Sequence, residues 1–399
     1  MNERATYAGF RHSRRVRCLQ STQSVALVLL ALVAGGCAKD GPLIPPTPLT
    51  AIERTVSAAT QWTVNVGKRD KKNVSSFRPV SVGDTVYAAG VDGRVSAVNA
   101  NTGALKWQRR VQSALRSGVA ADETRVVVAN REGQLTALDA ESGDDLWTYD
   151  MSSEVLSAVA TGFGVVVARG ADGRIVGLDG VTGTERWTRT YTPPALTVYG
   201  YSPPVLLPTG VLLGLDDGRV VALSLDNGGT LWESRLTVAS GRSEIERLVD
   251  VDANILLDDR YIYAAGYQGN VARLEPQRGN QLWSAPLSTT VGISQSDSAL
   301  YAIDETDRVV ALDKDTGEMV WEQTALVGRK LTRPVLIGGA VVTVDFEGIV
   351  HLLDTASGEL KGRLDTGSSG RGSEPLVVDG QLVVQFADGK LRAIKTQAN

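Results

Sequence analysis

The sequence predicts an all-β protein: an eight-bladed β-propeller of four-stranded antiparallel blades, its ring closed by an N-terminal strand that pairs with the C-terminal blade. Three observations lead to this fold class. A unit that ends in tryptophan recurs roughly every forty residues, apolar and polar residues alternate within each unit, and one further tryptophan precedes the first unit. Repeats of this length that contain several short strands are typical of propellers.

The recurring unit begins with a glycine or a polar residue and ends with a tryptophan 14 positions later, as in GRVSAVNANTGALKW and DRVVALDKDTGEMVW. Six complete copies end at Trp107, Trp147, Trp187, Trp232, Trp283 and Trp321. A seventh copy has Gly362 where tryptophan is expected, and an eighth, which begins at Gly389, stops before that position. Eight copies predict eight blades.

Each unit alternates apolar and polar residues, turns at a glycine-containing pair and then resumes as a second strand, which is the pattern of a half-buried hairpin. A further apolar strand precedes each unit, for example ETRVVVAN at 123–130, GVVVARG at 164–170 and GAVVTVDF at 339–346. The segment ATQWTVNVG at 59–67 contains Trp62 without the preceding strands. We expect it to form the outer strand of the last blade, which would protect the sheet edges at the ring closure.

The N-terminal region reads as a targeting segment. Arginines precede SVALVLLALVAGG at 24–36, an apolar run too short to span a bilayer comfortably, and Cys37 follows small residues, which resembles a lipobox. We expect residues 1–36 to be a lipoprotein signal peptide, residues 37–56 the lipidated Cys37 with a Pro-rich tether, and residues 57–399 the propeller. Ala38 stands where aspartate resembles an inner-membrane retention signal, so the outer membrane, periplasmic face, is favoured. Plain secretion with an incidental cysteine is the alternative.

Charge argues against a nucleic-acid partner, and cysteine content argues against stabilisation by a disulfide. The chain has a formal net charge of −4, and the arginine-rich first 36 residues make the remainder more acidic, so nucleic acid is not expected as a partner. Cys18 lies in the signal segment, so the exported domain has no cysteine pair and depends on its core for stability.

The string A-x-(D/N)-x-x-T-G-x-x-x-W resembles the tryptophan-docking motif of quinoprotein-type propellers. In that superfamily the indole packs between adjacent blades, near a glycine of the next blade. The resemblance implies that the tryptophans are architectural and do not indicate a quinone cofactor. This blade-docking role falls on Trp62, Trp107, Trp147, Trp187, Trp232, Trp283 and Trp321.

The lipobox, the tether, the eight units and an insertion that contains ERLVDVD at 246–252 together resemble the BamB family, lipoprotein subunits of the outer-membrane β-barrel assembly machinery. The resemblance implies a non-catalytic scaffold without a cofactor other than the lipid on Cys37. It also implies docking on the POTRA domains of the central barrel subunit, which assists folding and insertion of outer-membrane proteins. Unfolded precursors of those proteins are a further candidate partner, by strand addition at a blade edge.

Two neighbouring connections between units are longer than the others, at 191–204 and 236–255. Variable loops on a rigid scaffold often bind partners. By the family resemblance, partner-binding positions fall on Leu196, Val198, Tyr199, Arg247, Asp250 and Asp252. Tyr199 replaces the family's arginine, which leaves apolar contact there. The second segment is interpreted as a short helical turn that begins at Ser243. The alternative to partner binding is a solvated loop in which Arg247 pairs with a local acid.

Enzyme function is the main alternative from another class. A quinoprotein dehydrogenase would need metal-binding residues, a catalytic base and, commonly, a vicinal disulfide. After the signal segment the sequence holds one histidine, His351, within the strand pattern GIVHLLD, so a His-rich metal site or a catalytic triad is not expected and His351 is interpreted as a strand residue. The carboxylates of VDVD are too few to predict a metal site. A generic periplasmic propeller scaffold with another partner is the third hypothesis.

Overall fold

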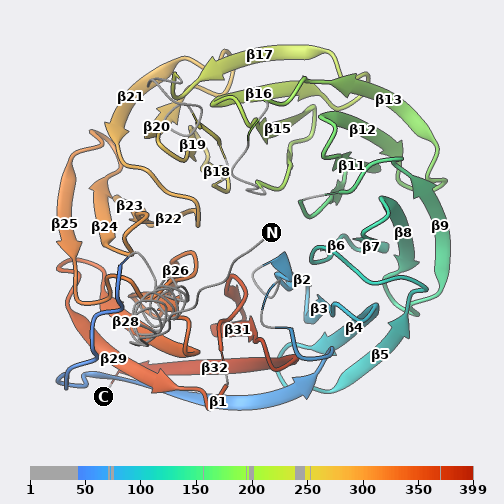
Figure 1. The fold of residues 1–399 in the computed structure, drawn as a ribbon. Coiled ribbons are helices and arrows are strands. Elements are labelled where there is room, and N and C mark those ends of the chain that lie inside the picture. Colours follow the sequence, from blue (N-terminus) through green and yellow to red (C-terminus); the bar gives the residue numbers. More distant parts are fainter. Residues whose placement is uncertain are drawn as a thin grey trace, which may run out of the picture. The chain divides into compact units, whose positions relative to one another are not determined.

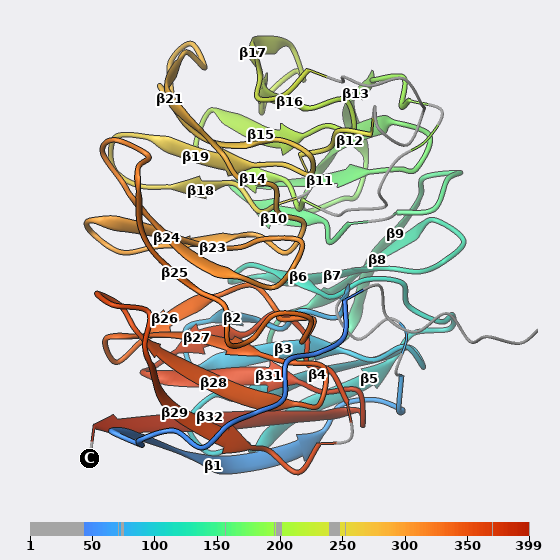
Figure 2. The same cartoon turned by 60° about the vertical axis from the view of Figure 1, so that its left-hand side comes forward.

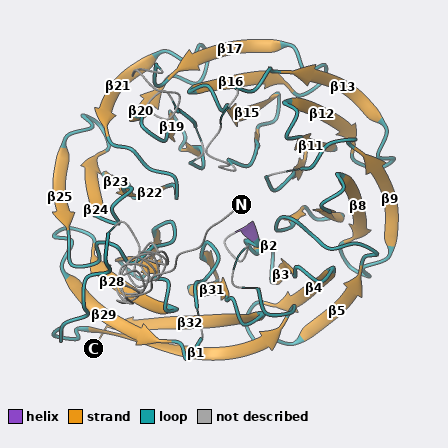
Figure 3. Ribbon diagram, in the orientation of Figure 1, coloured by secondary structure: helices purple, strands orange, loops and turns teal. Residues whose placement is uncertain are grey.

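The computed structural model describes residues 44–70, 72, 76–155, 157–194, 196, 202–238, 248–251, 253–368 and 370–398. The chain divides into two compact units, residues 1–45 and 46–399, and the second contains every strand described below. In the described part of that unit, 32 strands form eight four-stranded antiparallel sheets. The sheets follow one another around a ring in sequence order, and strands make up most of each blade (Figure 1 and Figure 3). The predicted eight-bladed propeller is therefore confirmed.

The first four blades are numbered in chain order, and each runs from its inner to its outer strand. They comprise β2 (Val80–Val82), β3 (Thr85–Ala89), β4 (Arg94–Asn99) and β5 (Leu105–Arg110); β6 (Ala120–Ala121), β7 (Arg125–Ala129), β8 (Gln134–Asp139) and β9 (Asp145–Asp150); β10 (Ala160–Gly162), β11 (Val165–Arg169), β12 (Arg174–Asp179) and β13 (Glu185–Thr190); and β14 (Val205–Leu206), β15 (Gly210–Gly214), β16 (Arg219–Ser224) and β17 (Thr230–Arg235).

Blades 5 to 7 have the same order, and blade 8 draws its outer strand from the N-terminal side. They comprise β18 (Leu256–Leu257), β19 (Ile262–Ala265), β20 (Asn270–Leu274) and β21 (Gln281–Pro286); β22 (Ile293–Gln295), β23 (Ala299–Ile303), β24 (Val309–Asp313) and β25 (Met319–Gln323); β26 (Val335–Ile337), β27 (Ala340–Val344), β28 (Ile349–Asp354) and β29 (Leu360–Asp365); and β30 (Leu376–Val378), β31 (Gln381–Gln385), β32 (Lys390–Ala398) and β1 (Val56–Asn65).

The ring closes as the sequence predicts. Strand β1 pairs antiparallel with β32, from Val56 opposite Ala398 to Asn65 opposite Lys390, and the two strands lie side by side in Figure 2. The strand begins three residues earlier than the segment singled out in the sequence. Because β1 pairs along the outer edge of β32, the last blade is completed to four strands and the ring is closed at its seam.

Seven of the eight blade junctions are sealed by a tryptophan. Trp107 of blade 1 donates its indole N–H to the carbonyl of Ala140 at 2.9 Å, and its ring covers Gly143 of blade 2 so closely that a Cβ there would lie 2.8 Å from the ring. The same pairing of indole N–H and carbonyl recurs from Trp62, Trp147, Trp187, Trp232, Trp283 and Trp321 to Ala100, Gly180, Leu225, Pro276, Lys314 and Thr355. Each indole buries an apolar surface worth roughly 2–3 kcal/mol.

The eighth junction explains why Gly362 stands in place of a tryptophan. In blade 8 the two outer strands come from opposite ends of the repeat region, so no hairpin turn is present there to receive an indole from blade 7. The start of β1 occupies that space, and a Cβ at position 362 would lie 2.4 Å from the carbonyl oxygen of Val56. Only glycine lets the closing strand pass.

The described residues contain no helix with the length and apolar character that crossing a bilayer would require.

Candidate partner-binding face

Both long connections lie on the same face of the propeller. The strands of a blade alternate in direction, so every connection from an outer strand to the next inner strand leaves from one face, together with the turns between the second and third strands. We call this the insertion face. Segment 191–204 joins blades 3 and 4, and segment 236–255 joins blades 4 and 5, so the two insertions flank one blade.

The structure places few of the predicted partner-binding residues. Leu196, in the first insertion, is 49% exposed. Asp250 is only 2% exposed, which sequence reasoning did not foresee. Val198, Tyr199, Arg247, Asp252 and the lipidation site Cys37 lie outside the described residues, as does the proposed turn at Ser243. The sequence analysis missed Val238, which is 68% exposed in the second insertion.

The end of the second insertion is packed into the propeller. The Val251 N–H donates to Leu215 O at 3.2 Å, and the side chain of Val251 joins the apolar cluster of blades 4 and 5. The Tyr267 N–H donates to the carbonyl of Asp250 at 2.7 Å, and a Cβ on Gly214 would overlap Val251. Residues 249–251 of the ERLVDVD motif therefore fix the base of the insertion against two blades.

The charges on blades 3 and 4 beside the insertions are paired. Arg169 forms a 2.6 Å ion pair with Asp216 across the blade boundary and donates to Gly214 O at 2.9 Å. Arg219 bridges Asp217 and Glu233, and these hydrogen bonds raise the pKa of its guanidinium above the usual value. The Arg219 guanidinium also lies 5.5 Å from the ring centre of Tyr191, at the start of the first insertion. These contacts make blade 4 a rigid base for the insertions.

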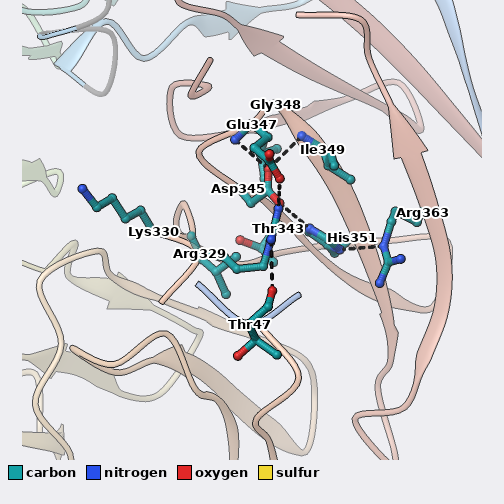
Figure 4. A network of polar contacts seen from close by, with 12 residues as sticks. Thr47, Arg329, Lys330, Thr343, Asp345, Glu347, Gly348, Ile349, His351 and Arg363 are labelled. Atoms are coloured by element: carbon teal, nitrogen blue, oxygen red, sulfur yellow. Dashed lines mark hydrogen bonds and ion pairs between the residues drawn. The ribbon is translucent and has the colours of Figure 1, made fainter. Parts of the chain in front are cut away.

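His351 is a buried strand residue, as predicted. It lies in β28 with no exposed surface, and its Nε2 contacts Asp345 Oδ2 at 2.9 Å while Arg363 Nε approaches its Nδ1 at 3.4 Å (Figure 4). These partners fit a neutral ring that donates from Nε2 and accepts at Nδ1. Burial lowers the pKa of His351 despite the carboxylate beside it. The described residues also contain no cluster of three or more histidine, cysteine or acidic side chains that could hold a metal.

The same polar network holds the segment that leads into β1. Arg329 donates to Asp345 at 2.8 Å and to the carbonyl of Thr47 at 3.1 Å, and Arg363 donates to the carbonyl of Thr50 at 2.9 Å. Figure 4 shows Arg329 between the buried carboxylate and Thr47. We call residues 46–55 the strap. Its Leu49 packs against the apolar cluster of blades 6 and 7, and the Thr55 N–H donates to Lys361 O at 2.9 Å.

The comparisons with known proteins point to one family. A family model described as outer membrane protein assembly factor BamB matches residues 48–114, 91–323 and 305–398. The chain is 44% identical over 369 residues to outer membrane protein assembly factor BamB of Pseudomonas aeruginosa, which covers 92% of this chain and 97% of that one. The protein of the same name from Legionella pneumophila is 41% identical over 377 residues, with 93% and 98% covered.

Solved structures agree with the fold. The crystal structure of BamB from Moraxella catarrhalis matches with a TM-score of 0.78 and 28% identity, over 85% of this chain and all of that one. A quinohemoprotein alcohol dehydrogenase from Comamonas testosteroni matches with a TM-score of 0.68 at 15% identity, over 84% of this chain and 76% of that one, which shows a shared fold alone. The relatives named BamB are assembly factors and not enzymes. The chain belongs to the BamB family of outer membrane protein assembly factors.

Proposed function

We propose that this chain is the lipid-anchored scaffold subunit of the outer-membrane β-barrel assembly machinery. It is held at the periplasmic face of the outer membrane through Cys37. It docks through the insertion face on the POTRA domains of the central barrel subunit and thereby assists the folding and insertion of outer-membrane proteins. Membership of the BamB family supports this proposal, and the insertion face supplies its structural basis.

The observation that carries the docking proposal is the contrast within the two insertions. Each presents an exposed aliphatic side chain, Leu196 in the first and Val238 in the second, while the end of the second insertion is packed against blades 4 and 5. Exposed apolar side chains on a rigid base are suited to an interface that depends on a few anchoring residues.

Asp250 has a different part in this proposal from the one expected of an exposed carboxylate. Its side chain is buried, and its backbone carbonyl holds Tyr267 of blade 5. We therefore assign it to positioning the second insertion, and we leave direct contact with the partner to the exposed residues. Replacing Asp250 by arginine would disturb packing and docking together, so it would not separate the two roles.

Co-purification from detergent-solubilised outer membranes tests the docking. Leu196→Glu and Val238→Glu should each lower the recovery of a POTRA-containing barrel protein by about fivefold or more, because each places a charge in the apolar contact. Val181→Glu is the matched control, since Val181 is 76% exposed in a turn on the opposite face of blade 3. All three variants should be lipidated and fold normally.

Equal recovery with all variants would place the interface elsewhere on the molecule. A wild-type chain that is lipidated but brings down another protein, and no POTRA-containing barrel, would favour a periplasmic scaffold with a different partner. Unfolded precursors are a further proposed partner, because the outer strand of each blade lies at a sheet edge where an extended chain can add by backbone pairing.

A further inference from the structure

The central channel of the propeller contains a pocket of about 490 Å³. Inner strands of blades 1, 5, 6, 7 and 8 line it, and several of these strands face one another across the centre of Figure 1. Its volume lies within the range of small-molecule sites. One part of its wall is apolar, with Val80, Leu256, Leu336 and Leu376, and another carries the guanidinium groups of Arg78 and Arg333.

The two arginines share a single carboxylate. Glu374 Oε2 accepts from Arg78 Nη1 and from Arg333 Nε, each at 3.2 Å, and Arg333 Nη1 donates a longer bond to Ile293 O at 3.4 Å. Among the described residues, no acceptor contacts Nε or Nη2 of Arg78, or Nη2 of Arg333. The cluster therefore has one positive charge in excess and guanidinium N–H groups left to donate.

Glu374 and Arg333 both remain charged in this cluster. Burial alone would raise the pKa of Glu374, but the charges of Arg333 and Arg78 outweigh burial and lower it below the usual value. Burial lowers the pKa of Arg333, whose side chain is 15% exposed, yet an arginine starts so high that it remains a cation. A positive charge held in a partly apolar channel is stabilised by an added anion.

The repeat shows that these charges are particular to three blades. Each occupies the position two residues before an inner strand, in blades 1, 7 and 8. The equivalent positions of the other five blades are occupied by Gly118, Ala158, Pro203, Asn254 and Val291. Because blades 7, 8 and 1 are consecutive, the charged cluster also ties together the part of the ring where the chain closes. A single ion pair would be enough to tie these blades together, so the second arginine is not needed for that purpose.

We propose that this pocket binds a small amphipathic anion, a carboxylate with a short apolar chain. The carboxylate lies between Arg78 and Arg333, where it competes in part with Glu374, and the chain packs against Val80, Leu256, Leu336 and Leu376. Paired donors from two guanidinium groups suit a planar oxyanion. This site is separate from the insertion face and does not depend on the docking proposed above.

Isothermal titration of the purified full chain with hexanoate tests the site. Saturable binding is expected, and Arg78→Gln or Arg333→Gln should weaken it by about tenfold or more, because each removes charge-assisted hydrogen bonds. Arg260→Gln is the matched control, since Arg260 is exposed in a turn of blade 5 and its side chain takes no part in the pocket. Hexanol has the apolar chain without the charge, and inorganic phosphate has the charge without the chain. Both should bind more weakly than hexanoate.

Glu374→Gln gives an effect of the opposite sign. It removes the competing carboxylate while keeping a hydrogen-bonding amide, so hexanoate should bind several-fold more tightly although the ring is less stable to heat. If the cluster were only a structural tie, all three variants would melt earlier and hexanoate would not bind saturably to any chain. That result, or binding unchanged in both arginine variants, would overturn the proposal. If inorganic phosphate bound as tightly as hexanoate, the apolar chain would not contribute to binding, and an amphipathic ligand would be ruled out.

Discussion

The seven junctions sealed by tryptophan and the eighth, which has none, solve the same packing problem by different means. At the seven, an indole from one blade covers a glycine of the next and donates to a carbonyl three residues before that glycine. At the eighth, Gly362 makes room for Val56, and the strap and β1 supply the packing from the other side of the repeat region. A repeated seal depends on one residue per blade, whereas the closing seal depends on a continuous segment of chain.

The largest expected effect is at a tryptophan junction. Trp187 is 6% exposed and donates to Leu225 O at 2.8 Å, so Trp187→Ala leaves a cavity between blades 3 and 4 and an unpaired carbonyl. The free energy of unfolding should fall by about 3–5 kcal/mol. Chemical denaturation followed by tryptophan fluorescence and circular dichroism measures the change. If the free energy of unfolding fell by less than about 1 kcal/mol, the indole would not be a major source of stability at this junction.

A smaller loss is expected at the eighth junction. Gly362→Ala puts a methyl group against the carbonyl of Val56, so the closing strand must shift, at a cost of about 1–3 kcal/mol. Gly162→Ala is the control, because a Cβ there meets only Leu206 at an ordinary 3.5 Å. The same denaturation experiment distinguishes them. If both alanine variants were equally stable, the explanation for the missing tryptophan would be wrong.

The smallest expected effect concerns pH and the network beneath the strap. Burial lowers the pKa of His351 below its usual 6.5, so the folded state favours the neutral ring. The stability that the neutral His351 ring contributes is complete above pH 6.5. Below that pH the unfolded chain takes up a proton before the folded chain does, so the free energy of unfolding decreases. The decrease is at most about 1.4 kcal/mol per pH unit. His351→Gln should flatten the stability profile between pH 7.5 and 5. An unchanged profile would show that His351 titrates normally.

The period of the tryptophans carried most of the fold prediction. Six complete copies and two incomplete ones at one spacing predict eight blades, and Trp62 without its preceding strands predicts the closure that β1 and β32 form. The reason for Gly362 could not be read in this way, since it depends on a carbonyl some three hundred positions earlier in the chain. The strap is a similar case: a Pro-rich run indicates a tether, and only the fold shows Thr47 and Thr50 beside Arg329 and Arg363.

The site was less predictable than the fold. The long insertions were visible as changes in repeat spacing, but the burial of Asp250 follows from tertiary packing of Val251 between two blades. A third long connection, 66–79, precedes the first complete unit, so its length does not appear as a change in the spacing between units. The channel cluster did leave a signal: Arg-Pro-Val occurs at both 78–80 and 333–335, and Glu-Pro-Leu at 374–376, each directly before an inner strand.

The strap also decides how mechanical load enters the ring. A pull on the chain ahead of residue 46 acts first on the hydrogen bonds that join Thr47 to Val327 and Arg329, and then on those at Thr50 and Thr55. Strand β1 is loaded only after these contacts to blades 6 and 7 have given way. Forced opening follows the rate at which the first contacts break, so the strap relieves the closing strand of strain. When force is applied to a propeller through this end of the chain, the strap therefore detaches before the pairing of β1 with β32 is disrupted.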